Sequence, residues 1–378
     1  MKVGIVVPYS WSFWGGVVDH AEQQLRALQA LGVEARVLIG NDPPGSFTRT
    51  LHPGLGRHEE PPEDVIPIGR SVIVPANGTL PNIVLSPPSI LRIRRVLERE
   101  RFDVVHIHEP MTPALGVAAL ALWNGPTVAT FHANGDLRWM RFGTPIWGFL
   151  ADRIDRRIAV SAEAAASAAR WLPGEYEIVP NGVLVPAHAD PAGRRDRVVF
   201  IGRHEPRKGM QVLLRAWPEI HARTGARLRL VGADPLAVRL VLARERVRND
   251  GIDILGVLSD DDLTEELLAA KLLVAPSLRG ESFGMVLTRA FACAIPAVAS
   301  DISGYRDVVT PETGVLVAPG DARALSGAVV DMLADEDARR RRGAAARELA
   351  REKYAWERIA GRLLGVYEAA AGRSRAAA

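Results

Sequence analysis

The sequence predicts an α/β protein of two domains, each built on a parallel sheet with helices on both faces. Short β-branched segments alternate with helical patterns, which is typical of parallel strands joined by crossover helices. The alternation runs through the first half of the chain and starts again near residue 198. The length of 378 residues also suits two domains of ordinary size.

Six strands are expected in each half, with ligand-binding loops at their carboxyl ends. The first series is Val3–Val7, Ala35–Leu38, Val104–Ile107, Thr127–Phe131, Ile158–Val160 and Tyr176–Val179. The second series is Val198–Ile201, Arg227–Val231, Ile252–Leu255, Leu272–Ala275, Ala297–Ala299 and Val315–Val317.

These series define the expected domain limits. The first domain covers residues 1–183 and the second covers 198–355, separated by a linker at 184–197 that is rich in Pro, Ala and charge. Residues 356–378 form a terminal helix and tail, within a segment rich in Ala, Arg and Glu.

Composition narrows the class of protein. The chain is 48% hydrophobic and 24% charged, so each domain can bury a core, and its net charge of +3 argues against general nucleic-acid binding. The lone Cys293 lies in an apolar segment and is expected to be buried rather than reactive. No apolar run reaches the roughly 18 residues that cross a bilayer, and the N-terminus begins directly with a strand. We therefore expect a cytoplasmic protein.

Two polar segments indicate a ligand site. Residues 200–209 read FIGRHEPRKG, in which Arg203 and Lys208 follow a buried strand and suit a diphosphate. Both side chains are expected to be solvent-exposed in the free protein. Residues 280–284 read GESFG, in which glycines frame Glu281, and such a carboxylate suits sugar hydroxyls. Together the two segments indicate a nucleotide-sugar site.

Other phosphate and metal motifs are absent from the sequence. It contains no glycine-rich dinucleotide fingerprint after a strand, no P-loop and no Cys/His cluster with zinc spacing. The acidic run Asp260–Asp262 is interpreted as the start of a helix capped by Ser259. The sequence predicts no metal ligands. A requirement for Mg²⁺ is left open, because no set of residues that would bind it is identified.

Glycines and histidines at strand ends leave two interpretations open. Gly15 and Gly16 precede a helix, where they either let a ligand approach the backbone or only form a tight turn. His132 ends a strand and is either a site residue or a structural one. His106 and His108 are expected to be structural, and Trp356 is expected to anchor the terminal helix.

The sequence resembles the family 4 retaining glycosyltransferases of the GT-B fold, in particular the phosphatidyl-myo-inositol mannosyltransferases. The similar segments span nearly the whole chain and include WGGVVDH, FDVVHIHEP, ATFHAN, FIGRHEPRKG and GESFGMVL. This resemblance implies two Rossmann-like domains that face each other across a cleft. It also implies a C-terminal helix that crosses back to the N-terminal domain.

The resemblance also implies roles for individual residues. Arg203 and Lys208 would hold the donor diphosphate, Glu281 the sugar hydroxyls, and His132 would line the reaction centre. Asp260, in the loop GVLSDD, would accept from guanine N1 and N2 and favours GDP. Further donor contacts would come from Gly15, Gly16, Val257, Ser282, Phe283, Gly284, Met285, Val286 and Arg289.

Three departures from the family pattern affect the ligands. The family has a second glutamate eight residues after the first, and this chain has Arg289 there. An arginine cannot accept hydrogen bonds from ribose hydroxyls, so it either lies near the ribose or pairs with a neighbouring acid. The donor-domain turn VGADP has one glycine fewer. Leu137 and Arg138 stand where phosphatidylinositol-specific members carry a lysine.

A basic helix is expected after Ser86, beginning with two prolines. Ile90, Ile93 and Leu97 share one face, and the opposite face is basic. This surface either meets anionic lipid or is a solvated exterior. The predicted acceptor or membrane residues are the helix residues Arg92, Arg94, Arg95 and Arg99, together with Asn77, which precedes the helix.

The sequence thus predicts a retaining hexosyltransferase, with mannose from GDP-mannose as the expected donor and a lipid-linked or polyol hydroxyl as acceptor. It needs no cofactor, binds no nucleic acid and would work in the cytoplasm or at the inner face of the cell membrane. Alternatives are a UDP-sugar transferase, a non-catalytic binding homologue, and a sugar-phosphate phosphorylase or epimerase of the same architecture.

Overall fold

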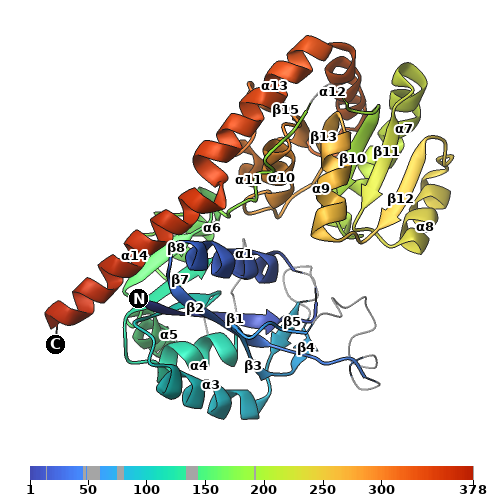
Figure 1. Ribbon diagram of the computed structural model, residues 1–378. Coiled ribbons are helices and arrows are strands. Elements are labelled where there is room, and N and C mark those ends of the chain that lie inside the picture. Colours follow the sequence, from blue (N-terminus) through green and yellow to red (C-terminus); the bar gives the residue numbers. More distant parts are fainter. Residues whose placement is uncertain are drawn as a thin grey trace. The chain divides into compact units, whose positions relative to one another are not determined.

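The computed structural model describes residues 1–13, 15–45, 48, 60–74, 81–132, 144–190 and 193–377, with the backbone alone at 144–146 and 373–377. The chain forms two compact units (Figure 1). Unit 1 comprises Met1–Gly182 and Trp356–Ala378, and unit 2 comprises Val183–Ala355.

Unit 1 is built on a parallel sheet in the order β3-β2-β1-β6-β7-β8-β9. Its strands are β1 (Lys2–Ser10), β2 (Glu34–Gly40), β3 (Val65–Gly69), β6 (Val104–His108), β7 (Thr127–Phe131), β8 (Arg156–Ala159) and β9 (Glu177–Ile178). Two short strands, β4 (Ser71–Ile73) and β5 (Asn82–Val84), pair antiparallel beside it. The sequence analysis expected six of these strands and missed β3, β4 and β5.

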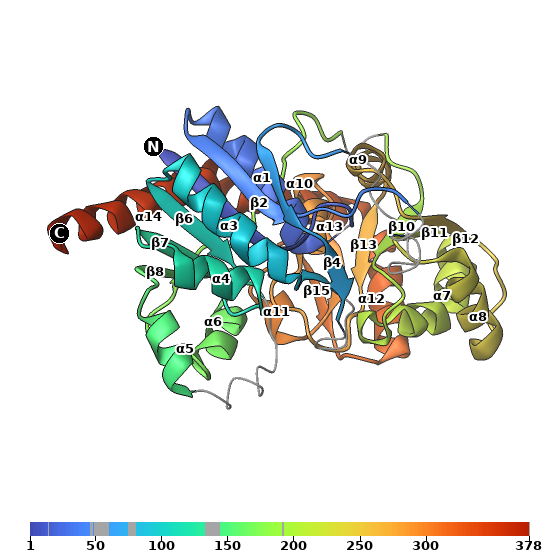
Figure 2. The ribbon, with the colours of Figure 1, turned by 90° about the horizontal axis from the view of Figure 1, so that it is seen from below.

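Helices cover both faces of this sheet, because successive strand side chains point to opposite sides. Val3, Ile5 and Val7 of β1 pack with α1 (Gly16–Ala30) and α14 (Trp356–Ala377). Val6 instead joins the core formed by α3 (Pro87–Glu100) and α4 (Leu115–Leu122). Figure 1 shows α1 above the sheet and α3 and α4 below it, and Figure 2 views the unit from the α3 side. The remaining helices are α5 (Thr144–Ala151) and α6 (Ala162–Ala169).

The terminal helix α14 belongs to unit 1, as expected for a helix that crosses back. A buried polar network fixes it: the Tyr367 hydroxyl lies 2.7 Å from both His106 Nδ1 and Gln24 Nε2. His106 Nε2 is 2.7 Å from Thr130 Oγ1, so this histidine is structural, as predicted. Trp356 is 3% exposed and packs in the same core, which confirms it as the anchor.

Unit 2 contains a six-stranded parallel sheet in the order β12-β11-β10-β13-β14-β15. The strands are β10 (Arg197–Ile201), β11 (Arg227–Val231), β12 (Ile252–Gly256), β13 (Leu272–Ala275), β14 (Ala297–Ser300) and β15 (Gly314–Val317). All six lie where the sequence predicted them. The order reverses between β10 and β13, and in doubly wound sheets such a reversal leaves space for a ligand beyond the strand ends.

Helices complete unit 2. They are α7 (Met210–Thr224), α8 (Pro235–Glu245), α9 (Asp260–Ala269), α10 (Met285–Ala292), α11 (Ser303–Arg306), α12 (Ala322–Ala334) and α13 (Glu336–Leu349), with short turns at Pro206–Lys208 and Ala350–Tyr354. One core joins Val198 and Phe200 of β10 to Trp217 of α7 and Val329 of α12. Cys293 is buried, and burial raises the pKa of its thiol to about 11, which matches its expected role as a small core residue.

The helix α3 differs from its predicted pattern on one face. Ile93 and Leu97 are buried, but Ile90 is 40% exposed. The buried stripe instead runs through Ser89, Ile93, Val96 and Leu97, which lie three to four residues apart and therefore share one side of the helix. Within the described residues, none of the helices is long and apolar enough to span a membrane.

Candidate functional site

The predicted diphosphate and sugar residues of unit 2 lie on loops that follow two neighbouring strands. Arg203 and Lys208 come after β10, and Glu281 comes after β13. These two strands flank the point where the strand order reverses. The sheet topology therefore brings residues that are more than seventy positions apart in sequence to the same edge.

Backbone contacts dock the two loops on each other. Leu278 N donates to Arg207 O at 2.7 Å. Gly209 has a φ of 71°, and a Cβ there would overlap the carbonyl oxygen of Pro276. Only glycine satisfies both the left-handed backbone and this close approach. Gly209 therefore brings Lys208 within reach of the second loop.

The Glu281 carboxylate joins the two loops. Its Oε1 lies 2.7 Å from Lys208 Nζ and 2.7 Å from Arg207 Nη1. Arg207 also pairs with Glu205 at 2.7 Å, and Arg203 pairs with the other oxygen of Glu205 at 2.9 Å. The sequence analysis did not single out Arg207 or Glu205, although both lie within the segment that it highlighted.

The exposure of the two predicted cations is not the same. The Arg203 side chain is 60% exposed, as expected, whereas that of Lys208 is only 17% exposed. The expectation that both are solvated was wrong for Lys208, because the docked loops place Glu281 against its ammonium group. In this five-residue cluster (Arg203, Glu205, Arg207, Lys208 and Glu281) three cations face two carboxylates, so it can accept an anion.

The N-terminus of α10 lies directly after this cluster. Its N-cap Gly284 has a φ of 89° and provides no side-chain cap, so the first backbone N–H groups remain available to an acceptor. Met285 and Val286 form the first turn and are partly exposed, as is Ser282. Phe283 is instead 4% exposed and packs against Tyr354, so its side chain serves the core.

Arg289 pairs with an acidic residue on a neighbouring element. Its Nη2 donates to Asp260 Oδ1 at 2.7 Å, at the start of α9. Ser259 caps this helix by accepting from Asp262 N at 3.1 Å, as predicted for the acidic run. Val257, in the same loop, is 45% exposed. Of the two hypotheses for Arg289, the structure shows the pairing with an acid.

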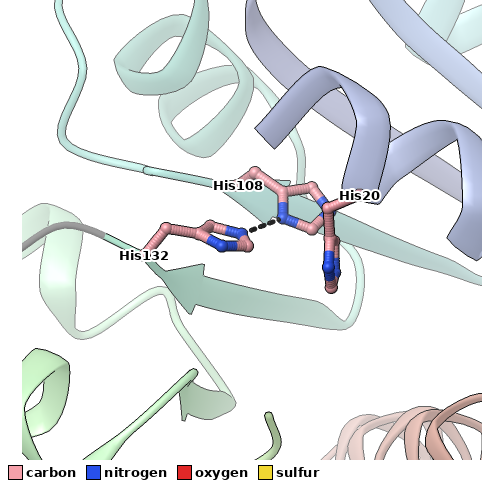
Figure 3. Close-up of side chains that lie close together, drawn as sticks. All are labelled: His20, His108 and His132. Atoms are coloured by element: carbon pink, nitrogen blue, oxygen red, sulfur yellow. Dashed lines mark hydrogen bonds between the residues drawn. The ribbon is translucent and has the colours of Figure 1, made fainter. Parts of the chain in front are cut away.

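Histidines of unit 1 gather at the carboxyl ends of β6 and β7 (Figure 3). His108 Nδ1 and His132 Nε2 lie 2.8 Å apart, and His20 of α1 packs edge-on against both rings. Burial lowers the pKa of His132 and of His106 to about 3, and it lowers those of His20 and His108 well below their usual value. All four are therefore neutral at pH 7.

His20 was not predicted as part of this cluster. Two features of the sequence indicate such a cluster. Residues 106, 108, 130 and 132 alternate along two strands and therefore share one face of the sheet, and His20 and Gln24 lie four residues apart, on one side of a helix. That face is the one that α1 and α14 cover.

The predicted glycine turn begins α1. Gly15 is its N-cap with a φ of −171°, and a Cβ there would meet only Val18, at 3.9 Å. Neither the backbone angle nor packing requires glycine at this position. That Gly15 and Gly16 keep the backbone open to a ligand stays a prediction.

The basic residues of α3 are all exposed: Arg92, Arg94, Arg95 and Arg99. Arg94 pairs with Glu98 and Arg99 pairs with Glu100. The predicted acceptor residue Asn77 and the substituted positions Leu137 and Arg138 lie outside the described residues.

Solved structures share this fold over nearly the whole chain. Sucrose-phosphate synthase from Thermosynechococcus elongatus matches with a TM-score of 0.73 and 22% identity, covering 97% of this chain and 98% of that one. Anabaena Alr3699/HepE in complex with UDP and glucose matches with a TM-score of 0.73 and 17% identity, over 98% and 100% of the two chains. The fold is therefore that of the GT-B class, as expected.

Sequence comparison places the chain in a family within that class. Residues 14–185 match the model for Glycosyltransferase Family 4, and residues 195–335 match that for Glycosyl transferases group 1. The phosphatidyl-myo-inositol mannosyltransferase of Mycobacterium leprae (strain TN) is 34% identical over 98% of this chain and 97% of its own length. The D-inositol 3-phosphate glycosyltransferase of Acidothermus cellulolyticus is 27% identical over 96% of this chain and 88% of its own length. The chain belongs to the family 4 glycosyltransferases, and it is a hexosyltransferase.

Proposed function

We propose that this glycosyltransferase moves a mannosyl residue from GDP-mannose to a hydroxyl of a lipid-linked or polyol acceptor, with retention of configuration. The observation that carries the donor part is the contact of Glu281 with Lys208 and Arg207 at the strand-order reversal of unit 2. The mannosyl part rests on the phosphatidyl-myo-inositol mannosyltransferases among the relatives.

The reaction requires stabilisation of a departing nucleoside diphosphate. Arg203, Lys208 and the α10 N-terminus are preorganised to receive that negative charge. On donor binding, Lys208 leaves Glu281 for the diphosphate, and Arg207 keeps the carboxylate in place. One lone pair of Glu281 then becomes free to accept from a sugar hydroxyl. Within unit 2, Glu281 binds the sugar hydroxyls, and the leaving phosphate takes the proton of the acceptor. His132 of unit 1 is proposed, from the family resemblance alone, as a residue of the reaction centre.

The choice of base depends on Asp260. Guanine offers N1–H and N2–H donors to a carboxylate, whereas uracil offers a single N3–H. Arg289 occupies one oxygen of Asp260 and leaves the other available. We propose that Arg289 holds this carboxylate toward the base. A UDP-sugar is the second candidate donor, because a contact of Arg289 with both oxygens of Asp260 would leave none to accept from guanine.

The acceptor side is proposed for unit 1. The exposed arginines of α3 support contact with an anionic lipid surface, since each basic residue near such a surface contributes on the order of 1 kcal/mol. Leu91 and Ile90, which are 62% and 40% exposed, would add apolar contact on the same helix.

The diphosphate clamp is tested by Lys208→Ala and Arg203→Ala. Each should weaken binding of GDP and cut transfer by about 10- to 100-fold, because a charge-assisted bond to an anion contributes about 1.5–3 kcal/mol. Calorimetry and turnover measure both effects. Arg223→Ala, which removes an exposed arginine of α7 paired with Glu219, is the control and should change neither. Wild-type turnover in both clamp variants would contradict the assignment.

The base preference is tested by Asp260→Asn and Arg289→Ala. Asp260→Asn should weaken GDP binding about tenfold and leave UDP binding nearly unchanged. Arg289→Ala should weaken GDP binding less, because the carboxylate persists but is held less firmly. Asp261→Asn, at the exposed neighbouring position, is the matched control. Equal losses for GDP and UDP, or no loss for either, would remove Asp260 from base recognition.

The membrane surface is tested by replacing Arg92, Arg95 and Arg99 with Ser. Co-sedimentation with anionic vesicles should fall about 100-fold in partition coefficient, whereas transfer to a soluble acceptor should persist. Arg239→Ser with Arg244→Ser on the outer face of α8 is the control and should bind vesicles like the wild type. If the wild-type protein does not bind anionic vesicles, the basic face of α3 is only a solvent-exposed surface.

A further inference from the structure

The histidine cluster of unit 1, formed by His20, His108 and His132, has the composition of a transition-metal site (Figure 3). The three residues can each supply one ring nitrogen, and these atoms lie within 4.8 Å of one another. The sequence predicted no metal ligands, because the three residues are spread over three elements. Their spacing along the chain resembles no zinc motif, and only the fold brings them together.

Two ring nitrogens in this cluster lack a hydrogen-bond partner. They are His20 Nδ1 and His108 Nε2, on side chains that are 5% and 0% exposed. A buried polar atom without a partner costs free energy. An ion that takes the lone pair of His20 Nδ1 would recover that cost, so this unpaired nitrogen is a second sign of a ligand site, independent of the clustering. His108 would bind the ion through Nδ1, the atom that faces His132.

The contact between His108 and His132 also suits metal binding. His108 and His132 face each other through Nδ1 and Nε2 at 2.8 Å, so one nitrogen must donate a proton to the other. A metal ion at this position would replace the shared proton.

The geometry requires only small adjustments. Zinc–nitrogen bonds of about 2.0–2.1 Å place tetrahedral ligand atoms about 3.3 Å apart. His108 and His132 are closer than that, and the ring of His20 must move inward by about 1.5 Å or less, measured against the same tetrahedral spacing. His20 can do so by rotating its side chain from α1, because its ring meets the other two edge-on rather than through a hydrogen bond.

Neighbouring groups would hold the ligands in place. Gln24 and Tyr367 fix the ring of His106, which stacks on His108 with centroids 4.5 Å apart. The backbone N–H of His132 donates to Glu109 Oε1 at 2.7 Å, which puts a carboxylate close to the cluster. Metal sites commonly depend on such outer contacts for the orientation of their histidines.

We propose that His20, His108 and His132 bind one Zn²⁺-type ion with three imidazole nitrogens and a fourth, exchangeable position. Imidazole ligands favour zinc and its neighbours over Mg²⁺, which prefers oxygen ligands. Binding itself does not depend on the proposed function. A consequence does rest on it: an ion held by His132 withdraws that side chain from the reaction centre, so Zn²⁺ should inhibit transfer.

The test uses the full-length protein with Zn²⁺ and Co²⁺ alone. Calorimetry should give one Zn²⁺ per chain, and bound Co²⁺ should show the intense visible absorption of a four-coordinate ion. His20→Gln, His108→Gln and His132→Gln should each lower Zn²⁺ affinity at least about tenfold. His188→Gln, which removes an exposed histidine of unit 2, should leave affinity unchanged, and Mg²⁺ should not compete.

A measurement on the wild-type protein keeps the proposal testable even if the substituted proteins do not fold. X-ray absorption at the zinc edge should report three imidazole nitrogens at about 2.0–2.1 Å. Absence of Zn²⁺ binding, binding that survives all three cluster substitutions, or a first shell of oxygen atoms would each overturn the proposal. These measurements need no substrate, so they test the metal site independently of the proposed transferase function. Full transfer activity with the site loaded would refute only the inhibitory consequence.

Discussion

The proposed donor site of unit 2 depends on one carboxylate, that of Glu281, held between Lys208 and Arg207. A carboxylate that is largely removed from water is costly unless cations and hydrogen bonds compensate it. The two cations come from the loop after β10, and the carboxylate comes from the loop after β13, so the contact also fixes the two loops to each other. Gly209 makes this approach possible through its positive φ. Contacts within the protein thus hold the residues of the proposed anion site close together.

Unit 1 is organised around a different buried constraint, a set of neutral histidines beneath α1 and α14. His106 links α14 to the sheet through Tyr367, and His108 links the same face to His132. Every one of these rings is desolvated, and burial depresses their pKa values. The last helix of the chain therefore closes the first unit through polar contacts as well as through the apolar residues Ile359, Leu363 and Val366.

Much of the fold was predictable because its strands are short β-branched runs buried on both sides. All six strands of unit 2 follow from such patterns, whereas the return of α14 to unit 1 was implied by the family resemblance. Strands β3, β4 and β5 were missed, since prolines and short length weaken their signal. In the site, Arg203 and Glu281 follow from strand-end position, but the pairing of Arg289 with Asp260 depends on how α9 and α10 lie in space. The histidine cluster likewise combines residues of three elements. The sequence indicates it only through residues that share one face of a strand or one face of a helix.

The central claim is that unit 2 recognises a diphosphate, and it is tested most directly by thermal unfolding with GDP, GMP and mannose in separate samples. A ligand that binds only the folded protein stabilises it in proportion to the logarithm of its concentration over Kd. GDP should raise Tm clearly, GMP much less, and mannose alone very little, because Arg203, Lys208 and the α10 N-terminus act on the second phosphate. Equal shifts for GDP and GMP, or no shift with GDP, would contradict the account.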